Sequence, residues 1–510
     1  MTEEGEPIRQ PIAWAAISGV LYFVGFTGFG VWPLIFVFLL PLLRACEGRN
    51  ASTVFLLGWV AGAVAMVGGY YWVVHLLQAF AHLALPWAVL GLVLLSIWQG
   101  ACVGFMALGA VVLRRRWRWP HSLSLAVSMV AVEAFYPFLF PNYAGNTLYV
   151  VPVLTQTVEL VGMAAMGLLV GGVNGAIFDV WIARREREPS RAPVIVLGGL
   201  LLLSIVYGSV RLAQLDVKID EAPKLKVAMI QANLGARDKA GRRDEFIQRH
   251  RDMTREAVKT HPDLDLVVWP ESSYNAFLPR DRTDLAHVNG YLPVPLLFGA
   301  VTGEVSDGER RVFNTAVLTS STGALLSRFD KMRLLMFGET LPLVDTFPQI
   351  RGWFPRSATF TKGRTFEHLE LDDVSMLPMI CYEDIIPSFV RQLWSKAGPA
   401  DVLVNITNDS WYGDSHEPLT HLALASFRSI ETRRSMIRST NTGISAFVDP
   451  AGRIVKRTGQ WTREILVGEV PIFVDGGSTP YLVTGDWVGW LALVTYVVAF
   501  VPRRRRAGVR

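Results

Sequence analysis

Three polar residues that could carry out chemistry stand at the ends of apolar runs. Glu271 ends the run Leu-Val-Val-Trp-Pro-Glu, Lys331 follows Ser-Arg-Phe-Asp, and Cys381 ends Ser-Met-Leu-Pro-Met-Ile. Layered α/β enzymes usually place their sites at strand ends. Because 60 residues separate Glu271 from Lys331 and 50 separate Lys331 from Cys381, only a fold can bring the three together.

The three residue types are suited to nucleophilic catalysis. A cysteine attacks only as thiolate, so Cys381 needs a positive neighbour or a nearby base. Lys331 could supply the charge and stabilise an oxyanion, and Glu271 could take and return the proton. Each also has a purely structural interpretation, because Cys381 could be a small buried hydrophobe and the other two solvated charges.

Other chemistries fit the sequence less well. His416 and His421 are five residues apart with Pro418 between them, whereas the zinc metalloprotease helix needs a spacing of four and no internal proline. A nucleophile elbow, a P-loop and a dinucleotide glycine fingerprint are all absent from the sequence in a strand-to-helix context. The cysteines form no C-x-x-C pair, which argues against a zinc cluster.

The elements that must position these residues begin near Leu225. There the pattern changes to short β-rich runs separated by amphipathic helices, which predicts a layered α/β domain. Helices are predicted at 244–260 and at 418–434, and residues 450–452 predict a turn between two late strands. The predicted strands are 226–233, 266–269, 296–303, 312–320, 324–329, 376–381 and 402–407.

The composition of the 510-residue chain indicates a membrane protein. Hydrophobic residues make up 51% and charged residues only 18%, against about 25% charged in soluble domains. Disordered, collagenous and small disulfide-stapled proteins are thereby excluded. Most apolar segments approach the roughly 20 residues that span hydrocarbon. They are 12–29, 31–43, 53–75, 86–113, 122–141, 158–182, 193–211 and 482–502.

Arginines follow every second apolar segment, at Arg44, 114–116, 184–187 and 503–506. By the positive-inside rule this spacing predicts about eight spans, with residues 212–481 outside the cytoplasm. Arginines in this position favour topology signals over nucleic-acid binding. The second segment is short, and hydropathy leaves open whether the first two segments span the membrane or form a re-entrant hairpin.

Ionisable residues also lie inside predicted membrane segments: His75, Glu133 and Glu159. Charges at membrane depth are commonly functional. Each of these could instead lie near an interface or satisfy a neighbouring helix, and we favour that second interpretation. The acidic N-terminus lacks the basic start of a cleaved secretory signal, so we expect it to be retained.

The motifs around the three residues resemble those of a known superfamily. Residues 269–271 (Trp-Pro-Glu), 330–331 with 337–339 (Asp-Lys, Phe-Gly-Glu) and 381–383 (Cys-Tyr-Glu) are similar to the Glu-Lys-Cys signatures of nitrilases. About eight spans, with such a domain before the last one, resemble the bacterial apolipoprotein N-acyltransferase family. Further similar motifs are 408–415, 438–443, 479–481 and 485–486, so the resemblance covers nearly the whole chain.

The resemblance implies a ping-pong acyl transfer without cofactor or metal. In that family a cysteine takes an acyl chain from a phospholipid, commonly phosphatidylethanolamine, and passes it to the α-amine of a diacylglyceryl-cysteine at a lipoprotein's N-terminus. Carried over by motif, Cys381 is the nucleophile, Glu271 the general base and Lys331 the oxyanion-stabilising cation. The resemblance gives Glu339, Glu383 and Tyr382 supporting roles, with salt-bridge partners as the structural alternative for the two glutamates.

The implied architecture is a polytopic α-helical membrane protein with an inserted nitrilase-like α/β sandwich. Residues 1–222 form a bundle of about seven spans, 223–475 the catalytic domain on the periplasmic face, and 476–510 the last span and a basic tail. The expected location is the bacterial inner membrane, with phospholipid and apolipoprotein as partners and no nucleic acid. The alternatives are a membrane-tethered amidase and a catalytically silent receptor with the same domain.

Two departures from the family pattern bear on acceptor handling. Residues 234–239 lack a tryptophan that many members have, and Met336 replaces the usual proline before Phe-Gly-Glu. Several apolar residues nearby could form a mobile lid or acyl-facing surface, or be ordinary core. They are Leu334, Leu335, Met336, Phe337, Trp353 and Phe354.

Overall fold

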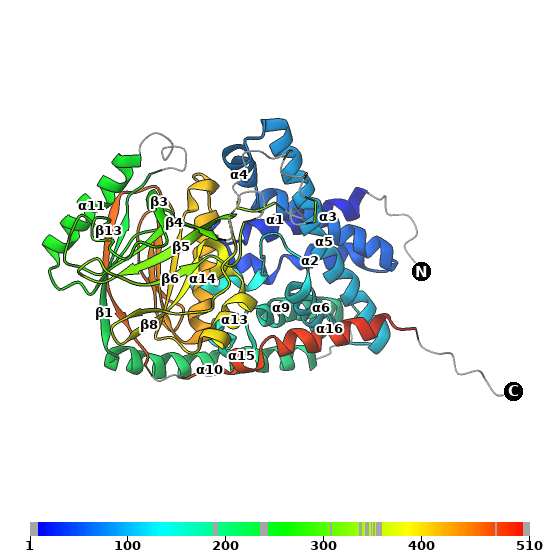
Figure 1. The fold of residues 1–510 in the computed structure, drawn as a ribbon. Coiled ribbons are helices and arrows are strands. Elements are labelled where there is room, and N and C mark those ends of the chain that lie inside the picture. The colour runs from blue at the N-terminus through cyan, green and yellow to red at the C-terminus, as the bar shows by residue number, and fades with distance from the viewer. Residues whose placement is uncertain are drawn as a thin grey trace. The chain divides into compact units, whose positions relative to one another are not determined.

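The structure, a computed structural model, describes residues 9–502 apart from 187–191, 235–242, 307–308, 336–338, 475–476 and most of 342–359. Its chain divides into two compact units, each discontinuous in sequence (Figure 1). The first unit comprises residues up to Tyr71, Leu90–Gly208 and Thr484 onward. The second comprises Trp72–Val89 and Ser209–Val483.

The first unit is helical. Two of its helices include residues of the second unit. The first residues of α5 and the last residues of α10 belong to that unit. The helices are α1 (Arg9–Val24), η1 (Trp32–Phe36), α2 (Leu39–Cys46), α3 (Ala51–Gly69), α5 (Leu85–Trp117), α6 (His121–Phe135), η2 (Ala144–Val150), α7 (Pro152–Thr155), α8 (Val158–Val161), η3 (Met163–Ala165), α9 (Met166–Glu186), α10 (Ala192–Glu221) and α16 (Trp487–Phe500).

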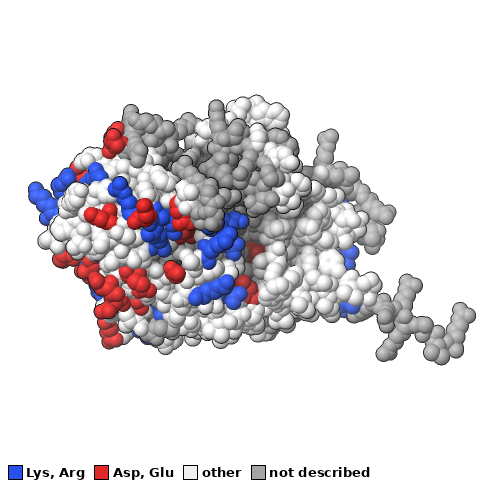
Figure 2. All heavy atoms as spheres, in the orientation of Figure 1, with Lys and Arg blue, Asp and Glu red and all other residues white. Residues whose placement is uncertain are grey.

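Four helical stretches are long and apolar enough to cross a membrane: Ala51–Gly69, Leu85–Trp117, Met163–Arg185 and Leu197–Glu221. Shorter apolar stretches of 10–17 residues occur at the other four predicted positions, Gln10–Val24, Trp32–Cys46, His121–Phe135 and Trp487–Phe500. On the face shown in Figure 2, most of the first unit's visible surface is uncharged. The count of eight spans and their orientation stay predictions, and the arginines at 503–506 lie outside the described residues.

Close helix packing in the first unit depends on small residues. A Cβ on Gly62 of α3 would overlap the carbonyl group of Gly100 in α5, and one on Gly100 would overlap the Ala63 backbone. Small residues that let backbones touch are the usual means of helix association in lipid, where apolar side chains gain little by leaving the solvent. The α3–α5 contact therefore has the character of a membrane helix pair.

The ionisable residues of the apolar segments have local partners. Glu133 of α6 accepts a hydrogen bond of 2.8 Å from the Ala144 amide, and Glu159 of α8 accepts one from the Tyr207 hydroxyl of α10. His75 lies in α4 (Val73–Phe80) of the second unit, against Gly413. The two glutamates therefore satisfy neighbouring elements, as the structural interpretation predicts.

Two β-sheets form the centre of the second unit. The first has the strand order β13-β1-β2-β4-β5-β6 with β3 paired to β4, and the second has the order β12-β11-β10-β9-β8-β7. The strands are β1 (Lys224–Gln231), β2 (Leu266–Val268), β3 (Tyr274–Pro279), β4 (Leu296–Ser306), β5 (Glu309–Thr319), β6 (Leu325–Asp330), β7 (Leu369–Leu371), β8 (Val374–Ile380), β9 (Val402–Thr407), β10 (Ser435–Thr440), β11 (Ala446–Val448), β12 (Ile454–Arg457) and β13 (Glu464–Pro471).

The two sheets pack face to face, with helices on their outer faces. Along β1, Val227 and Met229 enter the core that also holds the strands of the second sheet, whereas Ala228 and Ile230 pack with α11 (Arg243–Thr260). This alternation follows the two-residue period of a strand. Helices α13 (Pro387–Ala397) and α14 (Glu417–Thr432) cover the second sheet, whose core they join (Figure 1). The result is an α/β sandwich.

The predicted strands and helices of this domain are confirmed, with end shifts of at most three residues. Strands β3, β7, β10 and β13 were not predicted, and the turn at 450–452 joins β11 to β12. The predicted division at residues 222 and 475 stays a prediction. The segment Trp72–Val89 belongs to the same compact unit as the α/β domain. The last turns of α10 pack on Ala451 and Phe473 of that domain.

Strands β8, β9 and β10 run parallel in register, Met376 beside Val402 and Val402 beside Ser435. In the other sheet β1, β2 and β4 are parallel. Parallel strands direct their carboxyl ends to one edge, where α/β proteins place their ligands. This topology gathers the residues that follow β2, β8 and β9, although they are far apart in the chain.

We predict that Gly299→Ala in β4 lowers the melting temperature of the protein. A Cβ there would lie 2.5 Å from the Ser272 amide nitrogen and 2.6 Å from the Glu271 Cα. Overpacking of this kind costs about 1–3 kcal/mol, and about 1 kcal/mol shifts the melting temperature of a domain this size by about 2–4 °C. Tryptophan fluorescence of detergent-solubilised protein during heating measures the shift.

Gly199→Ala in α10 is the matched control, because no described atom beyond its own helix backbone and chain neighbours lies within 4 Å of the added carbon. It should melt at the wild-type temperature or above, since alanine favours helix. Equal melting temperatures for the two variants would contradict the proposed close approach of β4 to Glu271.

Candidate active site

Each residue of the predicted catalytic triad lies at the carboxyl end of a strand in the second unit. Glu271 follows β2, Lys331 follows β6 and Cys381 follows β8. Glu271 and Lys331 come from the first sheet and Cys381 from the second, so the site is built where the two sheets end together. The three residues are 6%, 2% and 5% exposed, so they are largely shielded from bulk water.

Lys331 forms the centre of a buried ion cluster. Its Nζ lies 3.1 Å from Glu271 Oε1 and 2.9 Å from Glu339 Oε2. The amide of Asn314, in β5, donates to both carboxylates, at 2.7 Å to Glu271 and 2.8 Å to Glu339. One ammonium and one amide thus fix two carboxylates that would otherwise repel each other.

Cys381 occupies a strained turn. Its φ is +57°, in the left-handed region that residues other than glycine rarely adopt. The short 3₁₀ helix η4 (Cys381–Ile385) starts there, and Glu383 within it accepts hydrogen bonds from the amides of Ile380, Met332 and Arg333 at 2.7–2.8 Å. Glu383 therefore connects the cysteine turn to the loop after Lys331. Burial raises the pKa of Glu383 to about 7.

The charges around Cys381 determine its resting protonation. Burial, and then the Glu271 carboxylate, raise the pKa of the thiol well above its usual value, while Lys331 and a hydrogen bond from Thr407 lower it less. Burial also opposes the charge of Lys331, but Glu271 and Glu339 outweigh it and raise the lysine pKa. At neutral pH the site therefore holds a neutral thiol beside an ammonium and needs a base to release the thiolate.

The supporting residues and the candidate lid lie around this cluster. The Tyr382 hydroxyl donates to the Leu334 carbonyl at 3.1 Å, and its ring lies 5.9 Å from the Lys331 ammonium. The Leu335 amide donates to Glu339 at 2.9 Å. Leu334 is buried. The other candidate lid residues (Met336, Phe337, Trp353, Phe354) and the stretch 235–239 lie outside the described residues.

Sequence reasoning missed several residues that contact the site. Asn314 bridges the two carboxylates, Asn405 donates to the Cys381 carbonyl at 2.9 Å, and Thr407 hydrogen-bonds to the thiol. Their signal was a polar side chain within a strand, since Asn314 lies within β5, and Asn405 and Thr407 lie within the otherwise apolar β9. A buried polar group needs a partner, so such positions point toward one another.

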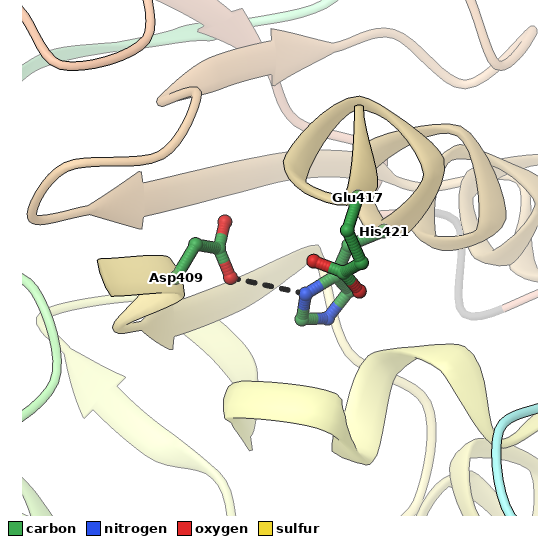
Figure 3. A group of neighbouring side chains, drawn as sticks. All are labelled: Asp409, Glu417 and His421. Atoms are coloured by element: carbon green, nitrogen blue, oxygen red, sulfur yellow. Dashed lines mark hydrogen bonds and ion pairs between the residues drawn. The ribbon is translucent and has the colours of Figure 1, made fainter. Parts of the chain in front are cut away.

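A second group of buried side chains was not recognised as a group from sequence. Asp409 of η5 (Asp409–Tyr412) and Glu417 and His421 of α14 turn toward one another (Figure 3), with donor atoms within 4.8 Å, close enough to hold a metal ion. Their contacts favour an ion-pair network instead. The two ring nitrogens of His421 contact Asp409 at 3.1 Å and Asp384 at 2.9 Å, and Arg438 also contacts Asp409.

Protonation of this group follows from burial and from its neighbours. Burial and Arg438 lower the pKa of His421, but Asp384 and Asp409 outweigh them and raise it to about 10, so both ring nitrogens donate. Burial raises the pKa of Glu417 to about 8. A metal would have to displace a proton from His421 and compete with a guanidinium, so this donor set does not fit a resident cation.

Comparison with known proteins agrees with this description. The carbon-nitrogen hydrolase family matches residues 226–473, and the apolipoprotein N-acyltransferase N-terminal domain matches residues 18–176. The apolipoprotein N-acyltransferase of Geobacter metallireducens is 30% identical over 98% of this chain and 96% of its own length. That of Rhodopseudomonas palustris is 30% identical over 96% of this chain and 95% of its own length.

A solved structure from Saccharomyces cerevisiae, a member of branch 10 of the nitrilase superfamily, covers 49% of this chain and 90% of its own, with 20% identity and a TM-score of 0.37. The sandwich and the family match over residues 226–473 define a nitrilase-like α/β domain. Because it also matches apolipoprotein N-acyltransferases over nearly its whole length, the chain belongs to the apolipoprotein N-acyltransferase family.

We predict that Lys331→Met suppresses alkylation of Cys381. Removing the ammonium leaves two carboxylates near the thiol and raises the thiol's pKa further. Each unit of increase cuts the thiolate fraction about tenfold, so labelling by a small alkylating reagent at pH 8 should slow at least about tenfold. Peptide mass spectrometry locates the label at Cys381. Lys396→Met, which removes a lysine lying 4.4 Å from the Phe366 ring, is the control and should label normally.

We also predict that Glu417→Gln changes the pH dependence of stability. The folded-state pKa of Glu417, about 8, lies above the usual 4.5, so the folded protein binds the extra proton and stability falls as pH rises between these values. Glutamine does not titrate. The melting temperature of the variant should therefore rise relative to wild type from pH 5 to pH 8, and a constant difference would contradict the raised pKa of Glu417.

Proposed function

We propose that this protein transfers an acyl chain from a phospholipid to the N-terminal α-amine of diacylglyceryl-cysteine in apolipoproteins, with Cys381 carrying the chain as a thioester. The observation that carries the proposal is the relationship to apolipoprotein N-acyltransferases over 98% of the chain. The burial of Glu271, Lys331 and Cys381 together, where strands of the two sheets end, supports it.

In the first half-reaction Glu271 takes the proton of the Cys381 thiol, and the thiolate attacks the sn-1 ester carbonyl of the phospholipid. Negative charge then develops on the carbonyl oxygen, and Lys331 stabilises it. Because the lysine is held by two carboxylates, its position needs little rearrangement during the reaction. The ester C–O bond breaks, Glu271 returns its proton to the leaving oxygen, and a lysophospholipid departs.

In the second half-reaction the α-amine of the lipoprotein attacks the thioester carbonyl. Glu271 takes a proton from the amine, the C–S bond breaks, and the sulfur leaves with that proton as the Cys381 thiol. The products are an amide and the resting enzyme. One carboxylate thus serves as base and acid in both halves, as general acid–base catalysis requires.

The supporting residues position this triad. Glu339 shares Lys331 and Asn314 with Glu271, so it limits the movement of both. Glu383 holds the cysteine turn through three backbone amides. Tyr382 places its ring beside the lysine and its hydroxyl on the loop at Leu334. In this mechanism none of the three exchanges a proton with substrate.

The membrane-spanning helices have a physical purpose in this reaction. Both substrates are lipids, and an acyl chain leaves the bilayer only at about 0.8 kcal/mol per methylene exposed to water. A catalytic domain held at the membrane surface avoids that cost. We place the protein in the bacterial inner membrane as a multi-pass protein, its catalytic domain on the periplasmic face, with phosphatidylethanolamine as the donor.

The test is transfer to a diacylated lipopeptide. Purified protein with phosphatidylethanolamine should give a hydroxylamine-labile acyl adduct on Cys381 by peptide mass, and then a triacylated lipopeptide. Cys381→Ser should give neither, because an oxygen ester forms poorly without thiolate attack. Cys102→Ser, which changes another buried cysteine, is the control and should retain activity.

Release of free fatty acid without a triacylated product would favour the amidase-type alternative, in which water takes the acyl group. An unreactive Cys381 in folded protein with accessible lipid would contradict the proposal.

A further inference from the structure

A closed network of buried charges lies behind Cys381. Asp384 belongs to the same short helix as the cysteine, and its two carboxylate oxygens contact His421 Nε2, at 2.9 Å, and the Arg438 guanidinium. Asp409 completes the network, since it contacts His421 Nδ1 at 3.1 Å and Arg438 Nη2 at 3.3 Å. All four side chains are at most 1% exposed. They come from η4, η5, α14 and β10, so the network joins four elements.

Two connections lead from this network to the nucleophile. Arg438 donates to the Asn405 side-chain oxygen at 2.9 Å, and the amide of Asn405 donates to the Cys381 carbonyl at 2.9 Å. Thr407, which hydrogen-bonds to the thiol, lies 3.4 Å from Asp409 through its hydroxyl. One connection holds the cysteine backbone and the other its sulfur.

The network is balanced in charge. The carboxylates of Asp384 and Asp409 oppose the guanidinium of Arg438 and the doubly donating ring of His421, which leaves no net charge. Glu417, beside His421, is mostly neutral at pH 7, since its pKa is about 8, and its Oε2 has no hydrogen-bond partner among the residues that the structure describes. Any charge added or removed here would act on Cys381 through the buried interior of the domain, where screening is weak.

Buried ion pairs contribute little net stability, because desolvation offsets their attraction. What such a network can supply is a fixed geometry. Cys381 needs one, because its φ of +57° is strained and persists only where its surroundings hold it. Gly443, in the loop after β10, packs so tightly on Asp409 that a Cβ there would overlap its carboxylate. The network thus has no room to rearrange on that side.

We propose that Asp384, His421, Asp409 and Arg438 are positioning residues for acyl transfer, which hold the strained Cys381 turn through Asn405 and Thr407 and, by their charge balance, set the ease with which the thiol ionises. This inference deepens the proposed function and rests on it for the reaction itself. The effect on the thiol can be measured without any lipid substrate, so the two can be tested separately.

Other charged and titratable groups also act on Cys381, and the test leaves them unchanged. Glu271, Lys331 and Glu339 face it from the segments that follow β2 and β6 of the first sheet. Tyr382 and Glu383 follow it in the chain, and Tyr412 of η5 lies within electrostatic range. Among the described groups that act on Cys381, only the network behind it contains two charges of each sign in contact. One substitution can therefore give the network a net negative or a net positive charge, and a second substitution can make it neutral again.

The experiment measures the pH midpoint of Cys381 alkylation in the full-length protein, by a small thiol reagent and peptide mass. His421→Gln leaves a net negative charge, which disfavours the thiolate, so the midpoint should rise by about half a pH unit or more. Asp384→Asn leaves a net positive charge, so the midpoint should fall by a similar amount. The double variant is neutral again and should return toward the wild-type midpoint.

Activity supplies the second readout. In each single variant the kcat for lipopeptide acylation should fall about tenfold or more, with KM within about twofold, because a displaced nucleophile slows the chemical step without weakening lipid binding.

Glu431→Gln is the matched control. It removes another buried carboxylate of α14, 2.9 Å from Arg428 and outside the network, and should leave the midpoint unchanged. If His421→Gln does not fold, Asp409→Asn replaces it, with a fall like that of Asp384→Asn.

Several results would overturn the inference. These are identical midpoints in all variants, shifts of the same sign in His421→Gln and Asp384→Asn, or a double variant that does not move back toward wild type. A midpoint that changes on dialysis against EDTA would show a bound cation in place of the ion-pair network. If the midpoints shift as expected but wild type forms no acyl adduct with phospholipid, the proposed function fails and the positioning network stands.

Discussion

The burial of one ammonium between two carboxylates is the interaction on which the rest of the site depends. Lys331 is 2% exposed, and an unpaired ammonium at that depth would cost several kcal/mol. Glu271 and Glu339 offset that cost, and Asn314 holds them in place. The same arrangement leaves one more negative than positive charge near Cys381. Burial, and then this excess charge, raise the pKa of the thiol and keep it protonated at rest. Moving the proton from sulfur to Glu271 then exchanges one negative charge for another beside the lysine.

The sandwich of two sheets makes this arrangement possible. Lysine and glutamate come from strand ends of one sheet and the cysteine from a strand end of the other, so neither sheet alone contains the site. The shared apolar core between the sheets fixes their relative position, and Glu383 adds a polar connection from the cysteine turn to the loop after Lys331. A rigid frame of this kind suits chemistry in which an acyl carbonyl has to meet a thiolate, an acid–base group and a cation at once.

Two buried charge clusters therefore flank the nucleophile, and they differ in kind. The cluster around Lys331 has groups that the proposed mechanism uses directly. The network of Asp384, His421, Asp409 and Arg438 is neutral and closed, with every charged group paired. A closed network is suited to holding a backbone in place, whereas the open, unbalanced cluster is suited to exchanging a proton. The carboxyl ends of parallel strands β8, β9 and β10 bring the second network behind the first.

The sequence by itself determined the class of domain, the positions of its long apolar segments and the three residues at strand ends. These properties follow from local periodicity, from composition and from short motifs, so no tertiary contact is needed to find them. Only the tertiary structure decided that Asn314, Asn405 and Thr407 contact the site, that Asp409 and His421 join Asp384 and Arg438, and that the Cys381 thiol is neutral at rest. These depend on burial and on strand pairing between residues far apart in the chain. A polar residue within a strand marks such a position, but the neighbouring residues do not identify its partner.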